Sequence, residues 1–226
     1  MSKVKVGIIG ATGYVGVELI RLLNAHPQVE LSAIGSNSFV DKSITEVYPS
    51  VGIGNDMKCM KNEDVIKNSD LIFTALPHGV SEEFVLQAVK EGKKVVDLGA
   101  DFRLKDEATF KEWYNVSFID KKLHEEAVYG LCEHYKDEIK NAKVIANPGC
   151  YVTSISLPLM PLLKEKLIKK EGIVADSKSG VTGAGRGLTL LSHYPEINEN
   201  MVPYKIGNHR HTPEIEQNLT DAAGEP

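Results

Sequence analysis

Cysteine, excess positive charge and long apolar runs are all scarce in this sequence of 226 residues. Its three cysteines, Cys59, Cys132 and Cys150, are odd in number and widely spaced, which excludes a disulfide framework and a paired metal motif. The net charge of -5 excludes a broad nucleic-acid surface. No apolar run reaches the roughly 18 residues of a membrane span, and the first residues lack the apolar core of a signal peptide. The sequence therefore predicts a cytoplasmic protein with reduced thiols and no metal, nucleic-acid or membrane partner.

Short β-rich runs alternate with helical patterns over most of the chain. We expect strands at residues 4–9, 29–35, 71–75, 94–98, 143–146 and 173–177, and helices at 15–23 and 81–90. This alternation is typical of βαβ units, so the predicted fold class is α/β with an N-terminal Rossmann-type parallel sheet. The pattern changes after Pro148. We place a domain boundary there, with a nucleotide-binding domain at 1–148 and the start of a catalytic domain at 149–226.

A glycine-rich segment lies directly between the first expected strand and the first expected helix. It reads Gly10-Ala11-Thr12-Gly13-Tyr14-Val15-Gly16. Glycines let backbone N–H groups approach a pyrophosphate, and the positive end of the helix dipole favours its charge. We therefore predict a dinucleotide site that uses Gly10, Thr12, Gly13, Tyr14, Val15 and Gly16. A purely structural turn is the alternative.

The end of the second expected strand bears on the choice between NAD and NADP. An acidic residue about 20 positions after the glycines usually binds the ribose of NAD. Here the segment is Gly35-Ser36-Asn37-Ser38, with Lys42 shortly after it. Ser36 and Lys42 would offer donors to a 2′-phosphate without repulsion, which predicts NADP. An ordinary polar turn stays open because Asp41 lies nearby.

Cys150 follows a sequence that favours a sharp turn. Pro148 biases Asn147 to an extended conformation and Gly149 frees the backbone, so Cys150 is expected at a strand-to-helix turn. The positive end of a helix raises the thiolate fraction that a nucleophile needs. Cys59 and Cys132 lack that setting in the sequence. We predict that Cys150 is a nucleophile, with a small buried hydrophobic residue as the alternative.

Two polar segments near the C-terminus suggest further site residues. His209 and His211 flank Arg210, which places titratable groups near neutral pH beside a permanent anion receptor. No further cysteine or histidine is spaced to complete a tetrahedral metal site, so acid/base chemistry is favoured, against a solvated loop. Residues 178–187 combine glycines, hydroxyls and flanking cations, as in an oxyanion nest, although a flexible loop fits equally well.

Six segments spread along the chain carry a family resemblance. They read GATGYVG at 10–16, ALPHGVS at 75–81, DLGADFRL at 97–104, NPGCYVT at 147–153, KSGVTGAGRG at 178–187 and HRHTPEIEQ at 209–217. None is specific alone, but together they resemble the N-acetyl-gamma-glutamyl-phosphate reductases of the aspartate-semialdehyde dehydrogenase superfamily. The resemblance implies NADPH-dependent reduction of N-acetyl-gamma-glutamyl phosphate to the semialdehyde and phosphate, through a thioester on Cys150, in arginine biosynthesis.

The resemblance also implies roles for individual residues. It puts the acid/base group at His211 or His209, with His211 preferred. Three further residues would line the cofactor: Pro77, Ser179 and Gly180. Four cations would hold the substrate carboxylate or phosphate: Arg103, Lys178, Arg186 and Arg210. A homo-oligomer formed through the catalytic domain is implied as well.

The chain departs from that family in two ways. Asn37 stands where the family commonly has arginine, which weakens the expected grip on the 2′-phosphate. The family's chains also run on beyond Pro226, so we expect an incomplete α+β catalytic and dimerisation domain, a stability below that of the complete enzyme, and weak or no turnover. Two other functions stay open: a sister reductase acting on aspartyl or aminoadipyl phosphate, and a non-catalytic NADP-binding module.

Overall fold

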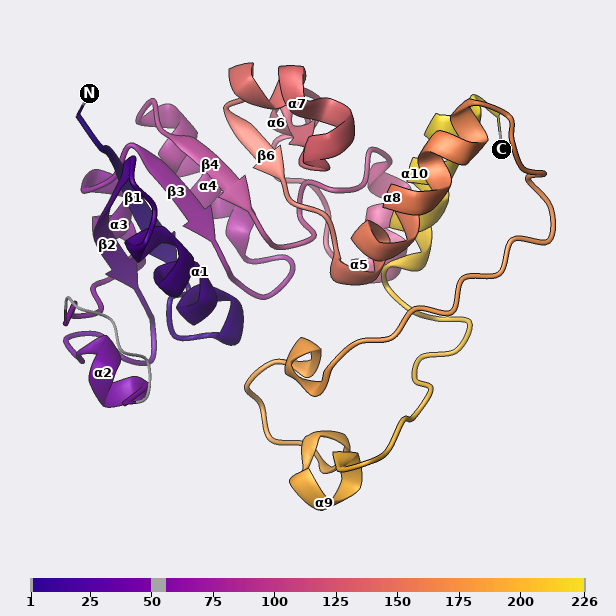
Figure 1. Ribbon diagram of the computed structural model, residues 1–226. Helices are drawn as coiled ribbons and strands as arrows, with labels where there is room; N and C mark the ends of the chain where they lie inside the picture. Colours follow the sequence, from indigo (N-terminus) through magenta and orange to yellow (C-terminus); the bar gives the residue numbers. More distant parts are fainter. Residues whose placement is uncertain (1, 50–55, 226) are drawn as a thin grey trace.

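The fold is built on one parallel sheet, seen in the computed structural model, which describes residues 2–49 and 56–225 (Figure 1). Its strands are β1 (Val4–Ile9), β2 (Val29–Gly35), β3 (Leu71–Thr74), β4 (Lys94–Asp97), β5 (Val128–Tyr129) and β6 (Val144–Ala146). Their order is β2-β1-β3-β4-β6-β5, and every pair is parallel. The predicted α/β class with a Rossmann-type sheet is confirmed.

Helices connect these strands and continue after the last of them. They are α1 (Tyr14–Asn24), α2 (Ile44–Val47), α3 (Asn62–Lys67), α4 (Ser81–Lys90), α5 (Glu107–Tyr114), α6 (Lys121–Glu126), α7 (Cys132–Asn141), α8 (Cys150–Lys164), α9 (Tyr194–Ile197) and α10 (Thr212–Ala223). Two short 3-10 turns, η1 (Val181–Ala184) and η2 (Leu190–Ser192), precede α9. None of the helices in the described ranges is both long and apolar enough to span a bilayer.

The alternation of side chains along β1 explains why helices cover both faces of the sheet. Ile8 packs in one buried cluster with Ile20 of α1. Its neighbour Ile9 points to the opposite face and packs in a second cluster with Val65 of α3 and Val85 of α4. Because both faces are buried, the strands are apolar almost throughout.

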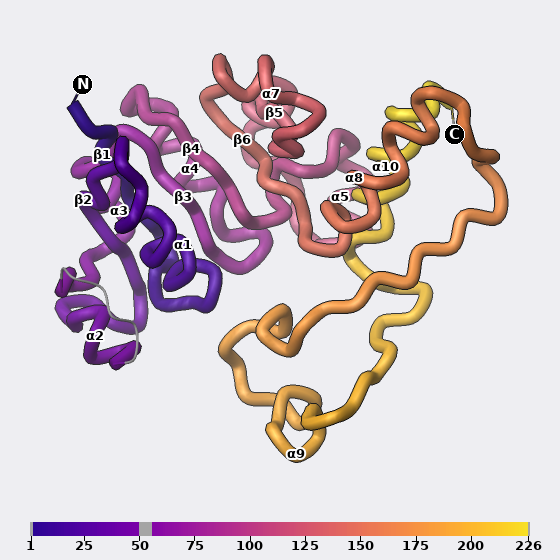
Figure 2. Tube along the Cα trace, viewed as in Figure 1, coloured from indigo at the N-terminus to yellow at the C-terminus, as the bar shows by residue number. Residues whose placement is uncertain are grey.

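The segment from α8 to α10 departs from this layered arrangement. Figure 2 shows it as a long loop that extends away from α8, carries α9 and returns to α10, which packs beside α8. The strand predicted at residues 173–177 is wrong. In the described chain this stretch pairs with no strand, and Val174 is 89% exposed. A β-rich run forms a strand only where a neighbour satisfies its backbone groups.

The turn after β1 depends on glycine for two separate reasons. Gly10 has a φ of 86°, in the left-handed region that other residues disfavour. A Cβ there would also lie 2.3 Å from the backbone oxygen of Ala75, which follows β3. The close approach of the two chain segments brings the start of α1 next to the carboxyl ends of the central strands.

We expect Gly10→Ala to destabilise the protein more than Gly92→Ala. Both glycines have positive φ, but nothing lies within 4 Å of a Cβ at Gly92, which has φ 74°. Gly92→Ala should cost about 1 kcal/mol from backbone strain alone. Gly10→Ala should cost about 1–3 kcal/mol more, because backbone atoms must move apart. Urea unfolding of both variants measures the difference, and equal midpoints would show that the Ala75 contact contributes nothing.

Candidate active site

Cys150 lies at the turn that the sequence predicts. β6 ends at Ala146, and Gly149 is the N-terminal cap of α8. Cys150 is the first residue of α8, and its side chain is exposed. The sequence-based contrast with Cys132 is wrong, however, because exposed Cys132 is likewise the first residue of a helix, α7. Cys59 is buried, and burial raises the pKa of its thiol. The helix dipole therefore cannot by itself distinguish Cys150 from Cys132.

The difference between the two exposed cysteines is a histidine. A Cβ added to Gly149 would lie 2.6 Å from Nε2 of His211, closer than any real side chain allows. Glycine at this position lets the imidazole rest directly on the backbone that precedes Cys150. The structure thus places His211 against the residue that precedes Cys150, and both His211 and Cys150 were predicted as site residues.

Glu214, in the first turn of α10, holds this arrangement in place. Its carboxylate is buried and accepts hydrogen bonds from the Gly149 N–H at 3.1 Å and the Tyr129 hydroxyl at 2.6 Å. Arg103 forms an ion pair with it at 3.4 Å and donates to the Leu98 carbonyl oxygen at 2.8 Å. Both charged side chains are almost fully buried, so each depends on the other for compensation. Arg103, predicted to bind substrate, is committed here to Glu214.

His211 and His209 have unusual electrostatic surroundings. Burial, followed by the positive charges of Arg103 and His209, lowers the pKa of His211 to about 4. Burial also lowers the pKa of His209. The expectation that these groups titrate near neutral pH is therefore wrong for His211, whose imidazole is neutral at pH 7.

Hydrogen bonds hold the two imidazoles in a fixed relation. The backbone N–H of His211 donates to Nδ1 of His209 at 3.0 Å, and Nε2 of His209 lies 3.0 Å from the hydroxyl oxygen of Tyr204. Tyr151, next to Cys150, places its ring edge-on to the His209 ring. These contacts form an aromatic and imidazole cluster beside the thiol.

Three members of this site were not predicted from the sequence: Glu214, Tyr204 and His78. His78 follows β3, accepts a hydrogen bond from the Ala100 N–H at 3.1 Å and has a pKa lowered first by burial. Glu214 occurs in the quoted HRHTPEIEQ segment, yet nothing local shows that its carboxylate is buried. In this site, the signals that the sequence carried were the turn before Cys150 and the spacing of His209 and His211.

The predicted dinucleotide site also has a defined geometry. The Thr12 and Ser36 hydroxyl oxygens lie 2.9 Å apart, which joins the glycine-rich turn to the end of β2. Gly13 caps α1, and Tyr14 and Val15 lie exposed at its start. At Gly16 a Cβ would lie 2.3 Å from the Gly10 carbonyl oxygen.

The other predicted site residues are dispersed. Lys42 pairs with Glu46 at 3.3 Å, and Lys178 pairs with Asp176 at 2.6 Å. Arg210 lies 5.7 Å from the centre of the Tyr114 ring. Pro77 lies in the loop after β3, and Ser179 and Gly180 are exposed between α8 and η1. Arg186 contacts the glycine-rich turn, where its Nη1 donates to the Thr12 carbonyl oxygen at 3.1 Å.

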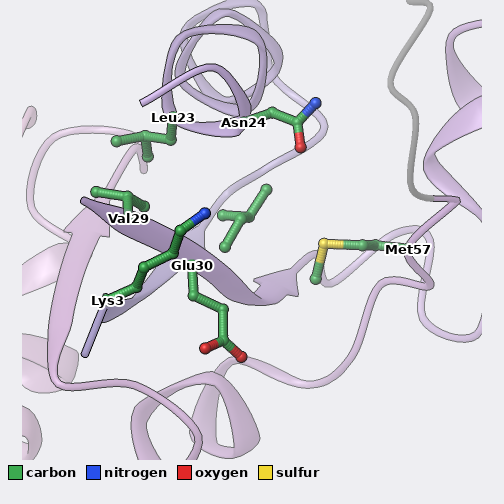
Figure 3. A pocket seen from close by; sticks show the side chains of 7 residues that line it. Lys3, Leu23, Asn24, Val29, Glu30 and Met57 are labelled. Carbon is green, nitrogen blue, oxygen red and sulfur yellow. The ribbon is translucent and has the colours of Figure 1, made fainter. Parts of the chain in front are cut away.

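In the described residues, neither a metal cluster nor a pocket at the sheet edge includes the predicted site residues. Residues 2–49 and 56–225 contain no group of three or more histidine, cysteine or acidic side chains placed to hold a metal ion. Figure 3 shows a pocket at the edge of the sheet, lined in part by Leu23, Glu30 and Met57. None of the predicted site residues lines it.

Two family models match the chain in sequence. The semialdehyde dehydrogenase NAD binding domain matches residues 5–142, and the semialdehyde dehydrogenase dimerisation domain matches residues 150–226. The N-acetyl-gamma-glutamyl-phosphate reductase of Clostridium beijerinckii is 53% identical over 97% of this chain and 64% of its own length. That of Pelotomaculum thermopropionicum is 51% identical over 98% of this chain and 65% of its own length. The chain thus spans slightly under two thirds of these relatives.

Solved structures agree with the fold. Aspartate semialdehyde dehydrogenase with NADP from Candida albicans has a TM-score of 0.51 and 20% identity, covering 73% of this chain and 48% of that one. Aspartate semialdehyde dehydrogenase II from Vibrio cholerae has a TM-score of 0.50 and 18% identity, covering 73% and 46%. Because the first of the two family models matches more than half of the chain, the chain belongs to the semialdehyde dehydrogenase family.

Proposed function

We propose that this chain is the nucleotide-binding and catalytic part of an NADPH-dependent N-acetyl-gamma-glutamyl-phosphate reductase. The observation that carries the proposal is the contact between the His211 imidazole and Gly149, directly before Cys150 at the start of α8. It pairs a nucleophile with a proton acceptor. The names of the relatives at about half identity support the substrate.

Acylation would begin at Cys150. The neutral His211 imidazole takes the thiol proton, and the sulfur attacks the carbonyl carbon of the acyl phosphate. A C–S bond forms, the C–O bond to phosphate breaks, and phosphate leaves with the bonding electrons. The imidazolium then lies beside the new thioester, where it can stabilise negative charge on the carbonyl oxygen.

The second step needs a reductant. A nicotinamide cofactor, when bound, would provide it as a hydride for the thioester carbonyl carbon. The glycine-rich turn would hold its phosphates, because Gly10 and Gly16 let the backbone of the turn pack closely and Gly13 caps the amino end of α1 without a side chain. During collapse to the aldehyde, the C–S bond breaks and the electrons return to Cys150. His211 holds the proton until the thiolate accepts it again.

The two parts of the chain would have separate roles in the reaction. Residues 1–148 would bind NADP through the glycine-rich turn and Ser36, and residues 149–226 would carry Cys150, His211 and His209. The match of residues 150–226 to a dimerisation domain supports assembly as a homo-oligomer. Among the cations, Arg210 is the candidate for the substrate carboxylate, because its guanidinium lies over Tyr114, whose hydroxyl bonds the Arg210 carbonyl oxygen.

Turnover should depend on Cys150 alone among the three cysteines. Cys150→Ser should reduce phosphate-dependent formation of NADPH from N-acetylglutamate semialdehyde by roughly 10³-fold or more, because the thioester cannot form. Cys132→Ser is the matched control, since Cys132 is also exposed at a helix start. Nicotinamide absorbance measures the rate. Turnover by Cys150→Ser equal to wild type would refute the mechanism, and preference for aspartyl or aminoadipyl phosphate would refute the substrate.

Alkylation tests the thiol without any substrate. Near pH 7 iodoacetamide should label Cys150 about 10-fold faster than Cys132, because the His211 imidazole lies against the residue before Cys150. Buried Cys59 should be slowest. His211→Asn should bring the rate of Cys150 down to that of Cys132, as measured by peptide mass spectrometry. Equal rates in the wild type would instead support a nucleotide-binding module without a nucleophile.

The lowered pKa of His211 predicts a pH-dependent stability. Between pH 7 and pH 5 the unfolded chain takes up a proton on this residue, with an ordinary pKa of about 6.5, while the folded state stays neutral until about pH 4. The free energy of unfolding should therefore fall on acidification, by about 1–2 kcal/mol from this residue. Asp97, whose pKa burial raises to about 6, acts in the opposite direction.

Comparing the wild type with His211→Asn isolates the histidine from Asp97. Urea unfolding at pH 7 and pH 5 should show a smaller loss of stability on acidification in the variant. The same loss in both proteins would show that His211 is protonated equally easily in the folded and unfolded states.

A further inference from the structure

A cation from the C-terminal half of the chain lies on the nucleotide-binding half. Arg186, which follows η1, donates from Nη1 to the carbonyl oxygen of Thr12 at 3.1 Å. Its guanidinium carbon lies 4.8 Å from the centre of the Tyr48 ring and 5.5 Å from that of Phe39. Three contacts therefore hold Arg186 against the glycine-rich turn and the two aromatic rings that follow β2. Both ring distances are within the range at which a cation and an aromatic ring attract each other.

The groups that Arg186 contacts are themselves held by hydrogen bonds. The Tyr48 hydroxyl donates to the same Thr12 carbonyl oxygen at 2.9 Å. The Thr12 hydroxyl is hydrogen-bonded to that of Ser36, the first residue after β2. These bonds link Arg186 to the carboxyl end of β2 through a short chain of contacts. In a Rossmann-type sheet this is the place at which the 2′ position of the adenosine ribose is bound.

The ion pairs of the structure favour Arg186 over Lys42, the cation that the sequence suggested for the 2′-phosphate. Lys42 is already paired with the Glu46 carboxylate at 3.3 Å. Within residues 2–49 and 56–225, by contrast, no carboxylate forms an ion pair with Arg186. A guanidinium has five N–H donors, and the bond to Thr12 uses one of them. The remaining donors suit a phosphate, which arginine can bind through two parallel hydrogen bonds.

We propose that Arg186 binds the 2′-phosphate of NADP and sets the preference for NADP over NAD, in place of the substrate contact that the sequence suggested. The inference deepens the proposed function, because it assumes that the glycine-rich turn binds a nicotinamide dinucleotide. It does not depend on the chemistry at Cys150. Arg186 acts here as a specificity residue supplied by the segment between α8 and α10.

The test measures binding of two adenosine fragments by calorimetry. Both 2′,5′-ADP and 5′-AMP contain the adenosine and the 5′-phosphate, and only the former has a 2′-phosphate. The wild type should prefer 2′,5′-ADP. R186Q should weaken 2′,5′-ADP roughly 10-fold or more, as expected for a lost charge-assisted hydrogen bond, and should change 5′-AMP less than about 2-fold. R186K should fall in between, because lysine keeps the charge and lacks the planar fork.

K42Q tests the rival cation. It should weaken 2′,5′-ADP less than about 3-fold if Lys42 stays committed to Glu46. The proposal is overturned if K42Q has the larger effect, if R186Q weakens both fragments equally, or if R186Q leaves 2′,5′-ADP binding unchanged. Circular dichroism of each variant shows that the fold is retained. Selective loss of 2′,5′-ADP binding in R186Q, together with a wild type that shows no reductase turnover, would support Arg186 and count against the proposed reaction.

Discussion

The buried pair of Glu214 and Arg103 is the interaction on which the arrangement of the site depends. A carboxylate and a guanidinium removed from water are tolerable only together, and separating such a pair costs about 3–5 kcal/mol. Glu214 also accepts hydrogen bonds from the Gly149 N–H and the Tyr129 hydroxyl, so it ties α10 to the end of β5 and the start of α8. His211 lies one helical turn before Glu214. Its contact with Gly149 thus follows from where this carboxylate is anchored.

Local signals predicted the parts of the fold that depend on neighbouring residues. The strand 29–35 and the helix 81–90 match β2 and α4 in full, because apolar spacing and flanking turns lie within each segment. The turn at Cys150 was predictable for the same reason, since Pro148 and Gly149 act on the backbone beside it. The glycine-rich turn after β1 likewise carries its own conformational requirement in Gly10.

The features that sequence could not supply all depend on distant partners. Arg103 and Glu214 are separated by 111 positions, and either would pass for an exposed charge in its own segment. The run at 173–177 has strand-forming residues but no neighbouring strand in the described chain. The predicted contrast between Cys132 and Cys150 failed for a related reason. A helix start is a local feature that the two cysteines share, whereas the imidazole against Gly149 belongs to His211, the residue that caps α10.

The segment between α8 and α10 links the two halves of the proposed chemistry. Arg186 on this segment contacts Thr12 and the rings after β2, while Tyr204 and His209, near its other end, lie beside Tyr151 and the thiol-bearing turn. A hydride can reach a thioester only if the nicotinamide and the sulfur are held at van der Waals distance. One stretch of chain contacts both the turn proposed to bind the adenosine end of the cofactor and the cluster beside Cys150. Anchoring Arg186 on a bound 2′-phosphate would therefore also restrain the residues that surround the thiol.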